Sequence, residues 1–127
     1  MIGSHRPEVL AKFYKEVFEK DADMHDGNWW GWKVGTSFLN VGEHSDVTGS
    51  AKEPQRIILN LETDDVKKEY ERIKKIEGIT IVKEPYGMTQ DGEETSAVDS
   101  PFWIATFADP DGNYLQLMTP WEEDLKN

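Results

Sequence analysis

The apolar pattern of the chain occurs twice, once before and once after residues 42–54. This repetition restricts the number of folds that the chain can adopt. Residues 42–54 combine Gly, Ser and Pro with mixed charges and no periodicity, as is typical of a linker. Before them, the sequence predicts a helix at 7–18, a polar connection at 21–28 and strands at 30–34 and 37–41. After them, it predicts a strand at 56–61, a helix from Val66 that ends at Gly78, strands at 79–82, 103–107 and 114–118, and a polar loop at 87–100. Two similar supersecondary units explain this order better than one irregular fold.

The length and charge of the chain narrow the classes of function. Its 127 residues suffice for one domain, because domains most often have about 100–150 residues. The net charge of −11 repels nucleic acid and anionic membrane surfaces, so we expect neither as a partner. No apolar run approaches the roughly 20 residues that span a bilayer, and the N-terminus lacks the apolar segment of a secretory signal, which favours a cytoplasmic protein. The absence of cysteine excludes disulfides and thiolate chemistry.

Three segments resemble one known family. Residues 109–118, DPDGNYLQLM, are similar to the C-terminal signature of the glyoxalase/bleomycin resistance/dioxygenase superfamily, also called the vicinal oxygen chelate proteins. Residues 10–18, LAKFYKEVF, resemble the first helix of that family, and residues 59–66, LNLETDDV, resemble its second strand-to-helix junction. The three segments follow the family's order, and together they span nearly the whole chain.

The resemblance implies an α+β fold of two βαβββ modules, whose curved mixed sheets surround a cleft that is often completed in a homodimer. We therefore expect a single domain at 1–127, with module one at 1–50 and module two at 55–120. The family's first strand would precede Ser4, where only Met1, Ile2 and Gly3 remain, so the first module is expected to lack most of its N-terminal strand. The exposed sheet edge would then need another cover, for instance a partner.

The resemblance also assigns positions to the His and Glu ligands of the family's metal-dependent enzymes. The first ligand would fall before Met1, and the others correspond to Asn40, to Arg56 or its neighbour Gln55, and to Gln116. Arginine is a permanent cation, and neutral amides hold divalent transition ions weakly, so we expect no metal and no cofactor here. Asn40, Arg56 and Gln116 would instead form a polar floor that binds a carboxylate or an amide. The alternative is that the two amides bond to one another or to water.

Strand alternation extends this set to the lining of a small-molecule site. Asn40 shares a face with Phe38, Arg56 with Ile58 and Asn60, and Gln116 with Tyr114 and Met118, while Leu115 and Leu117 pack under the helices. Trp103 is added as an aromatic wall. The expected ligand-binding residues are Phe38, Asn40, Arg56, Ile58, Trp103, Tyr114, Gln116 and Met118. The same face is alternatively a second apolar core with no ligand.

Aromatic and histidine residues supply the remaining candidates. Trp30, Trp32, Phe102 and Trp103 form either a stacking wall for a planar or cationic ligand, or sheet packing and a dimer contact. His5 and His25 lie in polar connections and are expected to be solvated. His44 lies between Glu43 and Asp46, where a role as base or adventitious metal ligand is the alternative to solvation. No catalytic residue is assigned.

These observations leave three functions open. The first is metal-independent binding of a small molecule, similar to the bleomycin resistance members, with a neutral or cationic ligand favoured by the charge of −11. The second is a metal-dependent lyase, similar to lactoylglutathione lyase, or a dioxygenase, which requires ligands outside the set above. The third is an interaction module that uses the Trp cluster at 29–32. Whether the chain is an enzyme stays open at this point, and a homodimer is the expected assembly.

Overall fold

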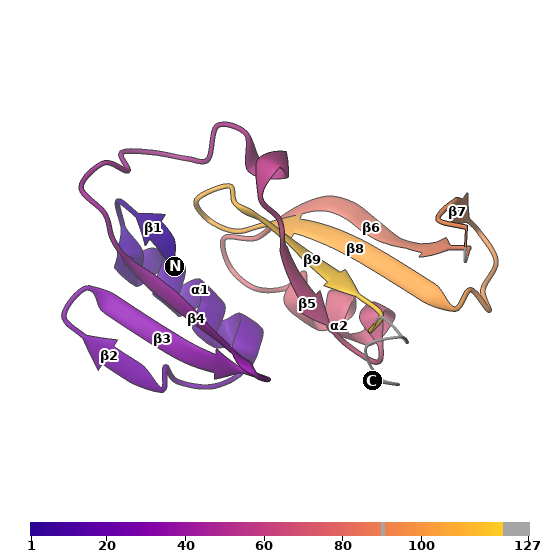
Figure 1. Cartoon of the computed structure of the whole chain (residues 1–127), viewed down its shortest axis with the longest axis horizontal. Helices are drawn as coiled ribbons and strands as arrows, with labels where there is room; N and C mark the ends of the chain where they lie inside the picture. Colours follow the sequence, from indigo (N-terminus) through magenta and orange to yellow (C-terminus); the bar gives the residue numbers. More distant parts are fainter. Residues whose placement is uncertain (90, 121–127) are drawn as a thin grey trace.

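The computed structural model describes residues 1–89 and 91–120 and contains two βαβββ modules in tandem (Figure 1). The first module comprises β1 (Ile2–Ser4), α1 (Pro7–Phe18), β2 (Met24–Asp26), β3 (Trp29–Val34) and β4 (Ser37–Glu43). A loop and the short 3-10 helix η1 (Pro54–Arg56) lead to the second module. It comprises β5 (Leu59–Glu62), α2 (Val66–Ile73), β6 (Thr80–Met88), β7 (Glu94–Thr95), β8 (Phe102–Ala108) and β9 (Tyr114–Met118). The predicted α+β fold of two such modules is confirmed.

Each module forms its own mixed sheet. Sheet 1 has the order β1-β4-β3-β2, and sheet 2 has the order β5-β9-β8-β6-β7. The first strand of each module pairs in parallel with the last one, β1 with β4 and β5 with β9. Strand β1 has only three residues, so it covers β4 only from Val41 to Glu43. The first strand of this module is thus as short as expected.

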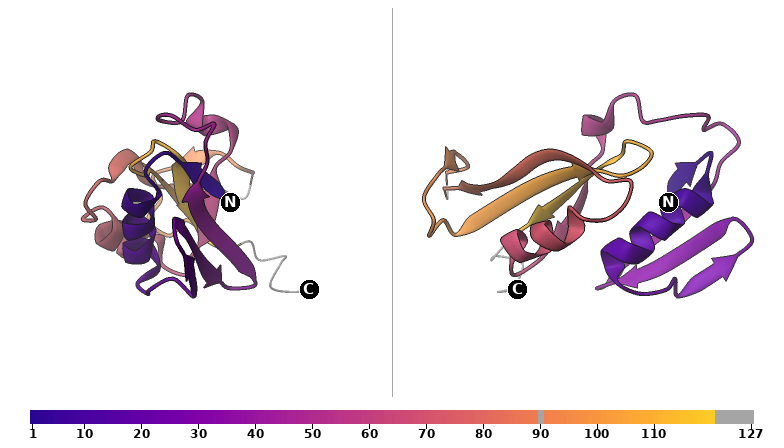
Figure 2. Two further views of the ribbon diagram at one scale, coloured as in Figure 1. Left: turned by 90° about the vertical axis from the view of Figure 1, so that its left-hand side faces the viewer. Right: turned by 180° about the vertical axis from the view of Figure 1, so that it is seen from behind.

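The helices cover one side of the sheets and leave the other side open. Helix α1 begins with Pro7, whose ring suits the first turn, and its apolar stripe of Leu10, Phe13, Tyr14 and Val17 is buried. Helix α2 is capped by Asp65, which accepts a hydrogen bond from the Lys68 backbone N–H. In Figure 2 both helices lie on the same side of the molecule, in front of the sheets when seen from behind. One continuous apolar core joins the helices to the facing sides of both sheets.

The two modules are connected by polar contacts at both ends of α1. At its start, Arg6 and Ser4 bond to the carboxylate of Asp111, at 3.0 and 2.6 Å. At its end, the Arg72 guanidinium of α2 donates to the carbonyl oxygens of Glu16 and Val17, at 3.0 and 2.8 Å. These carbonyls belong to the last turn of α1 and lack partners within the helix, so Arg72 caps one module from the other.

Some elements differ from the prediction. Strand β2 lies within residues 21–28, for which the sequence predicts a connection. The prediction missed this strand because its three residues are exposed, show no apolar alternation and pair with β3 alone in sheet 1. Strand β6 extends to Met88 and pairs with β7, so part of the expected loop at 87–100 is strand. Strand β5 begins at Leu59 instead of Arg56, since Pro54 starts the 3-10 turn of η1. No helix among the described residues is both long and apolar enough to cross a membrane.

Candidate functional site

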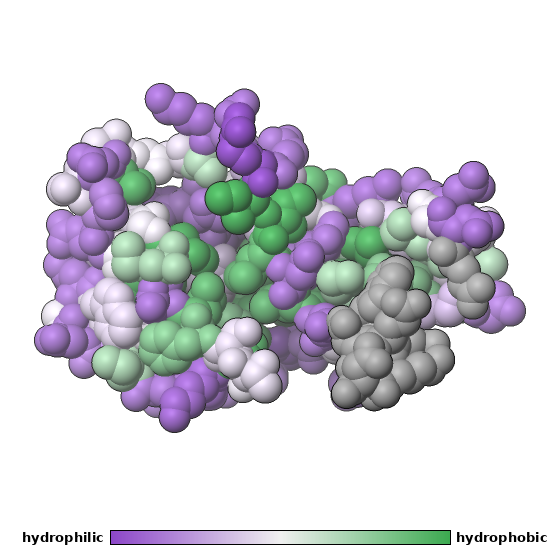
Figure 3. Space-filling model, in the orientation of Figure 1, coloured by the Kyte–Doolittle hydropathy of each residue, from purple (hydrophilic) through white to green (hydrophobic). Residues whose placement is uncertain are grey.

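The open face of sheet 1 is made by alternate residues of β3 and β4. The cross-strand pairs Trp29 with Gly42, Gly31 with Asn40, and Lys33 with Phe38 share this face, because paired residues point to the same side of a sheet. The intervening residues Trp32 and Val41 are buried against α1. In Figure 3, apolar surface on the open side gathers between the two sheets.

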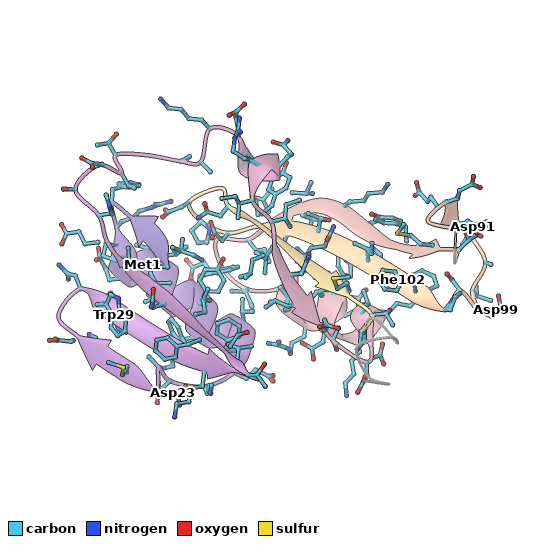
Figure 4. The ribbon with its side chains drawn as sticks, in the orientation of Figure 1. Met1, Asp23, Trp29, Asp91, Asp99 and Phe102 are labelled. Carbon is cyan, nitrogen blue, oxygen red and sulfur yellow. The ribbon has the colours of Figure 1, made fainter. Side chains whose placement is uncertain are left out.

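Two glycines make room for aromatic rings on this face. A Cβ at Gly31 would collide with the ring of Phe38, and a Cβ at Gly42 would lie 2.8 Å from Cδ1 of Trp29. The Trp29 and Phe38 rings are 6.1 Å apart between centroids, and Phe38 is 44% exposed. Met1 precedes β1, and its Sδ lies 3.5 Å from the same Cβ position at Gly42, so Met1 and Trp29 lie side by side (Figure 4). The face therefore presents aromatic surface to solvent instead of a polar covering.

Asn40 brings an unusual polar atom to this aromatic face. Its side-chain oxygen Oδ1 is buried and has no hydrogen-bond partner. Buried polar atoms are nearly always bonded, and leaving one unbonded costs about 1–3 kcal/mol. This oxygen therefore does not accept from Gln116, the bond that the sequence left open as the alternative to a polar floor. Asn40 thus retains an unpartnered acceptor that neighbouring groups cover.

The open face of sheet 2 carries Tyr114, Gln116 and Met118, as alternation predicts, while Leu115 and Leu117 are buried on the helix side. The amide Nε2 of Gln116 donates to Oγ1 of Thr106 on the neighbouring strand, at 3.3 Å. Gln116 is thereby satisfied within its own sheet, unlike Asn40.

Arg56 does not lie on a sheet. It ends η1, its side chain is 71% exposed, and its guanidinium pairs with the carboxylate of Glu53 at 2.7 Å. Ile58 precedes β5 and is half-buried. The predicted polar floor of Asn40, Arg56 and Gln116 is therefore divided between sheet 1, η1 and sheet 2.

Trp103 lies on the helix side of sheet 2, away from the other predicted residues. Its indole N–H donates to the carbonyl of Ser100 at 3.0 Å, and the Lys67 ammonium of α2 lies 3.8 Å from its ring centroid. Because Thr106 faces Gln116, alternation along β8 places Ile104 and Phe102 on the open side. Phe102, labelled in Figure 4, is thus the aromatic residue of β8 on that side. Alternation counted back from Thr106 is the signal that separates Phe102 from Trp103 within the aromatic candidates.

The other aromatic and histidine candidates are dispersed. Trp32 is buried and donates its indole N–H to the Lys20 carbonyl at 3.1 Å. Trp30 is half-buried on the helix side, where its ring stacks on His25 with centroids 4.7 Å apart. His5 is exposed, and His44 accepts through Nδ1 from the Asp46 backbone N–H at 3.2 Å.

The residues at the family's metal positions do not fit a divalent transition ion. Asn40 and Gln116 offer neutral amides, and Arg56 is a cation engaged with Glu53. Within residues 1–89 and 91–120, no group of three or more His, Cys, Asp or Glu side chains is placed to hold a metal ion.

Asp109 and Asp111 form a buried pair of carboxylates that the sequence did not indicate, since residues 109–118 served there as a family signature. Asp109 accepts from the Tyr14 hydroxyl at 2.8 Å, and its other oxygen accepts from the backbone N–H groups of Asp111 and Asn113. Burial raises the pKa of Asp109 despite these bonds, and burial beside Asp109 raises the pKa of Tyr14 well above its ordinary value. This cluster connects the modules, because Tyr14 belongs to α1 and Asp109 to the turn between β8 and β9.

No family model and no curated protein matches the sequence. Solved structures do match along nearly the whole chain. A glyoxalase/bleomycin resistance protein from Albidiferax ferrireducens T118 has a TM-score of 0.70 at 15% identity, over 94% of this chain and 95% of that one. A glyoxalase/bleomycin resistance protein/dioxygenase family enzyme from Burkholderia phytofirmans PsJN has a TM-score of 0.66 at 19% identity, over 93% of each chain.

A glyoxalase-related enzyme from Fulvimarina pelagi has a TM-score of 0.66 at 16% identity, over 94% of this chain and 84% of that one. Identities this low demonstrate a shared fold. The resemblance seen in the sequence is confirmed at that level: the chain has the fold of the glyoxalase/bleomycin resistance/dioxygenase superfamily.

Proposed function

We propose that the chain binds a small organic molecule on its open side, at the face of sheet 1 around Asn40, without a metal ion in the family's usual position. The observation that carries this proposal is the buried, unpartnered Oδ1 of Asn40. A ligand that displaces the groups covering this oxygen and donates a hydrogen bond to it removes a cost of about 1–3 kcal/mol from the complex. The acceptor therefore selects ligands with an N–H or O–H group.

The surroundings of Asn40 favour a planar ligand. Trp29 and Phe38 offer ring faces, and Gly31 and Gly42 keep the sheet surface beneath them free of further side chains. The net charge of −11 raises the local concentration of cations and lowers that of anions. We infer that the ligand is planar, neutral or cationic, and a hydrogen-bond donor.

The metal-dependent lyase or dioxygenase is the weaker candidate. It needs strong ligands, whereas the corresponding positions hold two amides and an ion-paired arginine. The structural neighbours include proteins named for resistance as well as enzymes, so they do not distinguish the two functions.

A second copy of the chain would complete this site. Phe38, Met24 and Met1 are 44%, 52% and 67% exposed on or beside the open face of sheet 1. Exposed apolar side chains that share one face are characteristic of an interface. Together with the resemblance, they support a homodimer in which this face is covered by another protomer.

Benzamidine tests the binding proposal, because it is a planar cation with N–H donors, and benzoate is the matched anion on the same ring. We expect benzamidine to bind saturably in ligand-observed NMR and benzoate to bind at least about fivefold more weakly. Asn40→Leu, which removes the acceptor at similar size, should abolish binding of benzamidine. Benzamidine binding that persists in Asn40→Leu would contradict the proposal. So would stoichiometric Zn, Ni, Mn or Fe in elemental analysis of the purified protein.

A further inference from the structure

A hollow on the helix side of sheet 1 lies outside the site proposed above. Helix α1 packs on β1, β3 and β4, and the ribbon of β2 and β3 extends past it when the molecule is seen from behind (Figure 2). The uncovered part forms a hollow of about 440 Å³, within the range of roughly 300–1,000 Å³ that is usual for small-molecule sites.

The hollow has one aromatic wall, and two other residues that line it are small. Trp30 and Trp32 of β3 and His25 of β2 form the wall, with the Trp30 and His25 rings stacked at an interplanar angle of 12°. Ala11 of α1 and Ala22 of the following loop lie opposite, and their methyl groups leave the space open. A flat apolar group suits such a site, because stacking adds to the burial of its surface.

The rim of the hollow carries one unpaired charge of each sign. Lys15 already pairs with Asp21 at 2.9 Å. The carboxylate of Glu8 and the ammonium of Lys12 also line the hollow, and neither has a partner among the described residues. They are four positions apart on α1, so their Cβ atoms lie about 6 Å from each other on one helix face. The rim thus offers one anion and one cation, one turn apart.

We propose that this hollow binds a small zwitterion with an aromatic ring, of the class of the aromatic amino acids. The ring lies against Trp30, the ligand's ammonium pairs with Glu8, and its carboxylate pairs with Lys12. A ligand of single charge satisfies only one of the two rim groups. This site is independent of the one around Asn40, since Trp30 and Asn40 lie on opposite faces of sheet 1.

Three probes with the same ring separate these contributions: L-phenylalanine with both charges, 3-phenylpropanoate with the carboxylate alone, and 2-phenylethylamine with the ammonium alone. Binding is followed by the shift of the Trp30 indole N–H resonance in ¹⁵N-labelled protein, assigned by its loss in Trp30→Phe. We expect L-phenylalanine to saturate this shift and to bind about fivefold more tightly than either other probe, as one exposed ion pair contributes.

Variants of the two rim residues should change the affinities of different probes. Glu8→Gln should weaken L-phenylalanine and 2-phenylethylamine about fivefold and leave 3-phenylpropanoate unchanged, and Lys12→Gln should weaken L-phenylalanine and 3-phenylpropanoate only. Ala22→Leu should weaken the binding of all three probes, because the larger side chain occupies part of the hollow. The matched controls Glu93→Gln and Lys68→Gln alter exposed charges elsewhere, and Phe38→Ala alters the other site; all three should bind L-phenylalanine as the wild type does. Absence of a saturable shift, or equal binding of the three probes, overturns the proposal.

Discussion

At the scale of single residues, the two amides at the family's metal positions have different roles. Gln116 donates to Thr106 and contributes to the cohesion of sheet 2. Asn40 retains a buried oxygen with no partner, which lowers the stability of the free protein. A residue that lowers the stability of the free protein and makes no compensating contact is best explained by a role in binding a ligand.

This cost is measurable. Asn40→Leu replaces the amide by an apolar group of similar size, so the free energy of unfolding should rise by about 1 kcal/mol. Gln116→Leu removes a satisfied amide and leaves Thr106 without its donor, so it should lower the free energy of unfolding by a similar amount. Urea denaturation of both variants gives the comparison. Destabilisation by Asn40→Leu would mean that the amide has a structural role.

Asp109 gives the fold a dependence on pH. Its pKa in the folded chain is raised by burial, whereas in the unfolded chain it has the ordinary value of about 3.9. A group with a raised folded pKa contributes its full stability below the unfolded pKa and loses it as the pH rises through the folded pKa. The free energy of unfolding of Asp109→Asn does not include this loss, because asparagine does not ionise. The free energy of unfolding of Asp109→Asn minus that of the wild type should therefore increase as the pH rises from about 4 to neutral.

Urea denaturation at a series of pH values measures this difference. The subtraction cancels the contributions of the many other carboxylates, because the variant retains them. Asp64→Asn, at an exposed position, is the control for the loss of one carboxylate. A difference for Asp109→Asn that falls with pH would contradict the direction stated for its pKa.

At the scale of elements, the strength of local signals decides what could be predicted from the sequence. Helix α1 and strand β9 were predicted with the bounds observed, because Pro7 and a buried stripe mark one, and strict alternation after the Gly112 turn marks the other. Strands β2 and β7 have three and two residues and exist through pairing with longer neighbours, which no local pattern reveals. The sequence left the face of Trp103 undetermined, because its side depends on the register of β8 against β9.

No local pattern in the sequence predicts the cap that α2 provides for α1. Its two hydrogen bonds join Arg72 to residues that precede it by 56 and 55 positions. Arg72→Met should lower the free energy of unfolding by about 1–2 kcal/mol, because two carbonyls of α1 and the Glu69 carboxylate lose a charged donor. Arg56→Met is the matched control, since among the described residues that guanidinium pairs with the exposed Glu53; its effect should stay below about 0.5 kcal/mol. Equal effects of the two substitutions in urea denaturation would show that the cap does not stabilise the chain.

At the scale of the whole molecule, the architecture is one-sided. Both helices cover the same side of the two sheets (Figures 1 and 2). Among the described residues, no helix or strand covers the open faces. The net charge of −11 opposes self-association over distances up to about one Debye length, roughly 8 Å at physiological salt. A homodimer must therefore gain its stability from apolar contact on these faces, and salt should strengthen it by screening the repulsion.

Sedimentation equilibrium tests this balance. We expect the wild type to form dimers whose dissociation constant falls as salt is raised, and Phe38→Lys to raise that constant at least about tenfold, because it places a cation in the apolar contact. Val98→Lys is the control: Val98 is 84% exposed but lies in the loop before β8, away from the open face of sheet 1, so the dissociation constant should not change. A monomeric wild type at high salt, or equal effects of the two lysines, would remove the apolar face as the basis of assembly and leave the Asn40 site to a single chain.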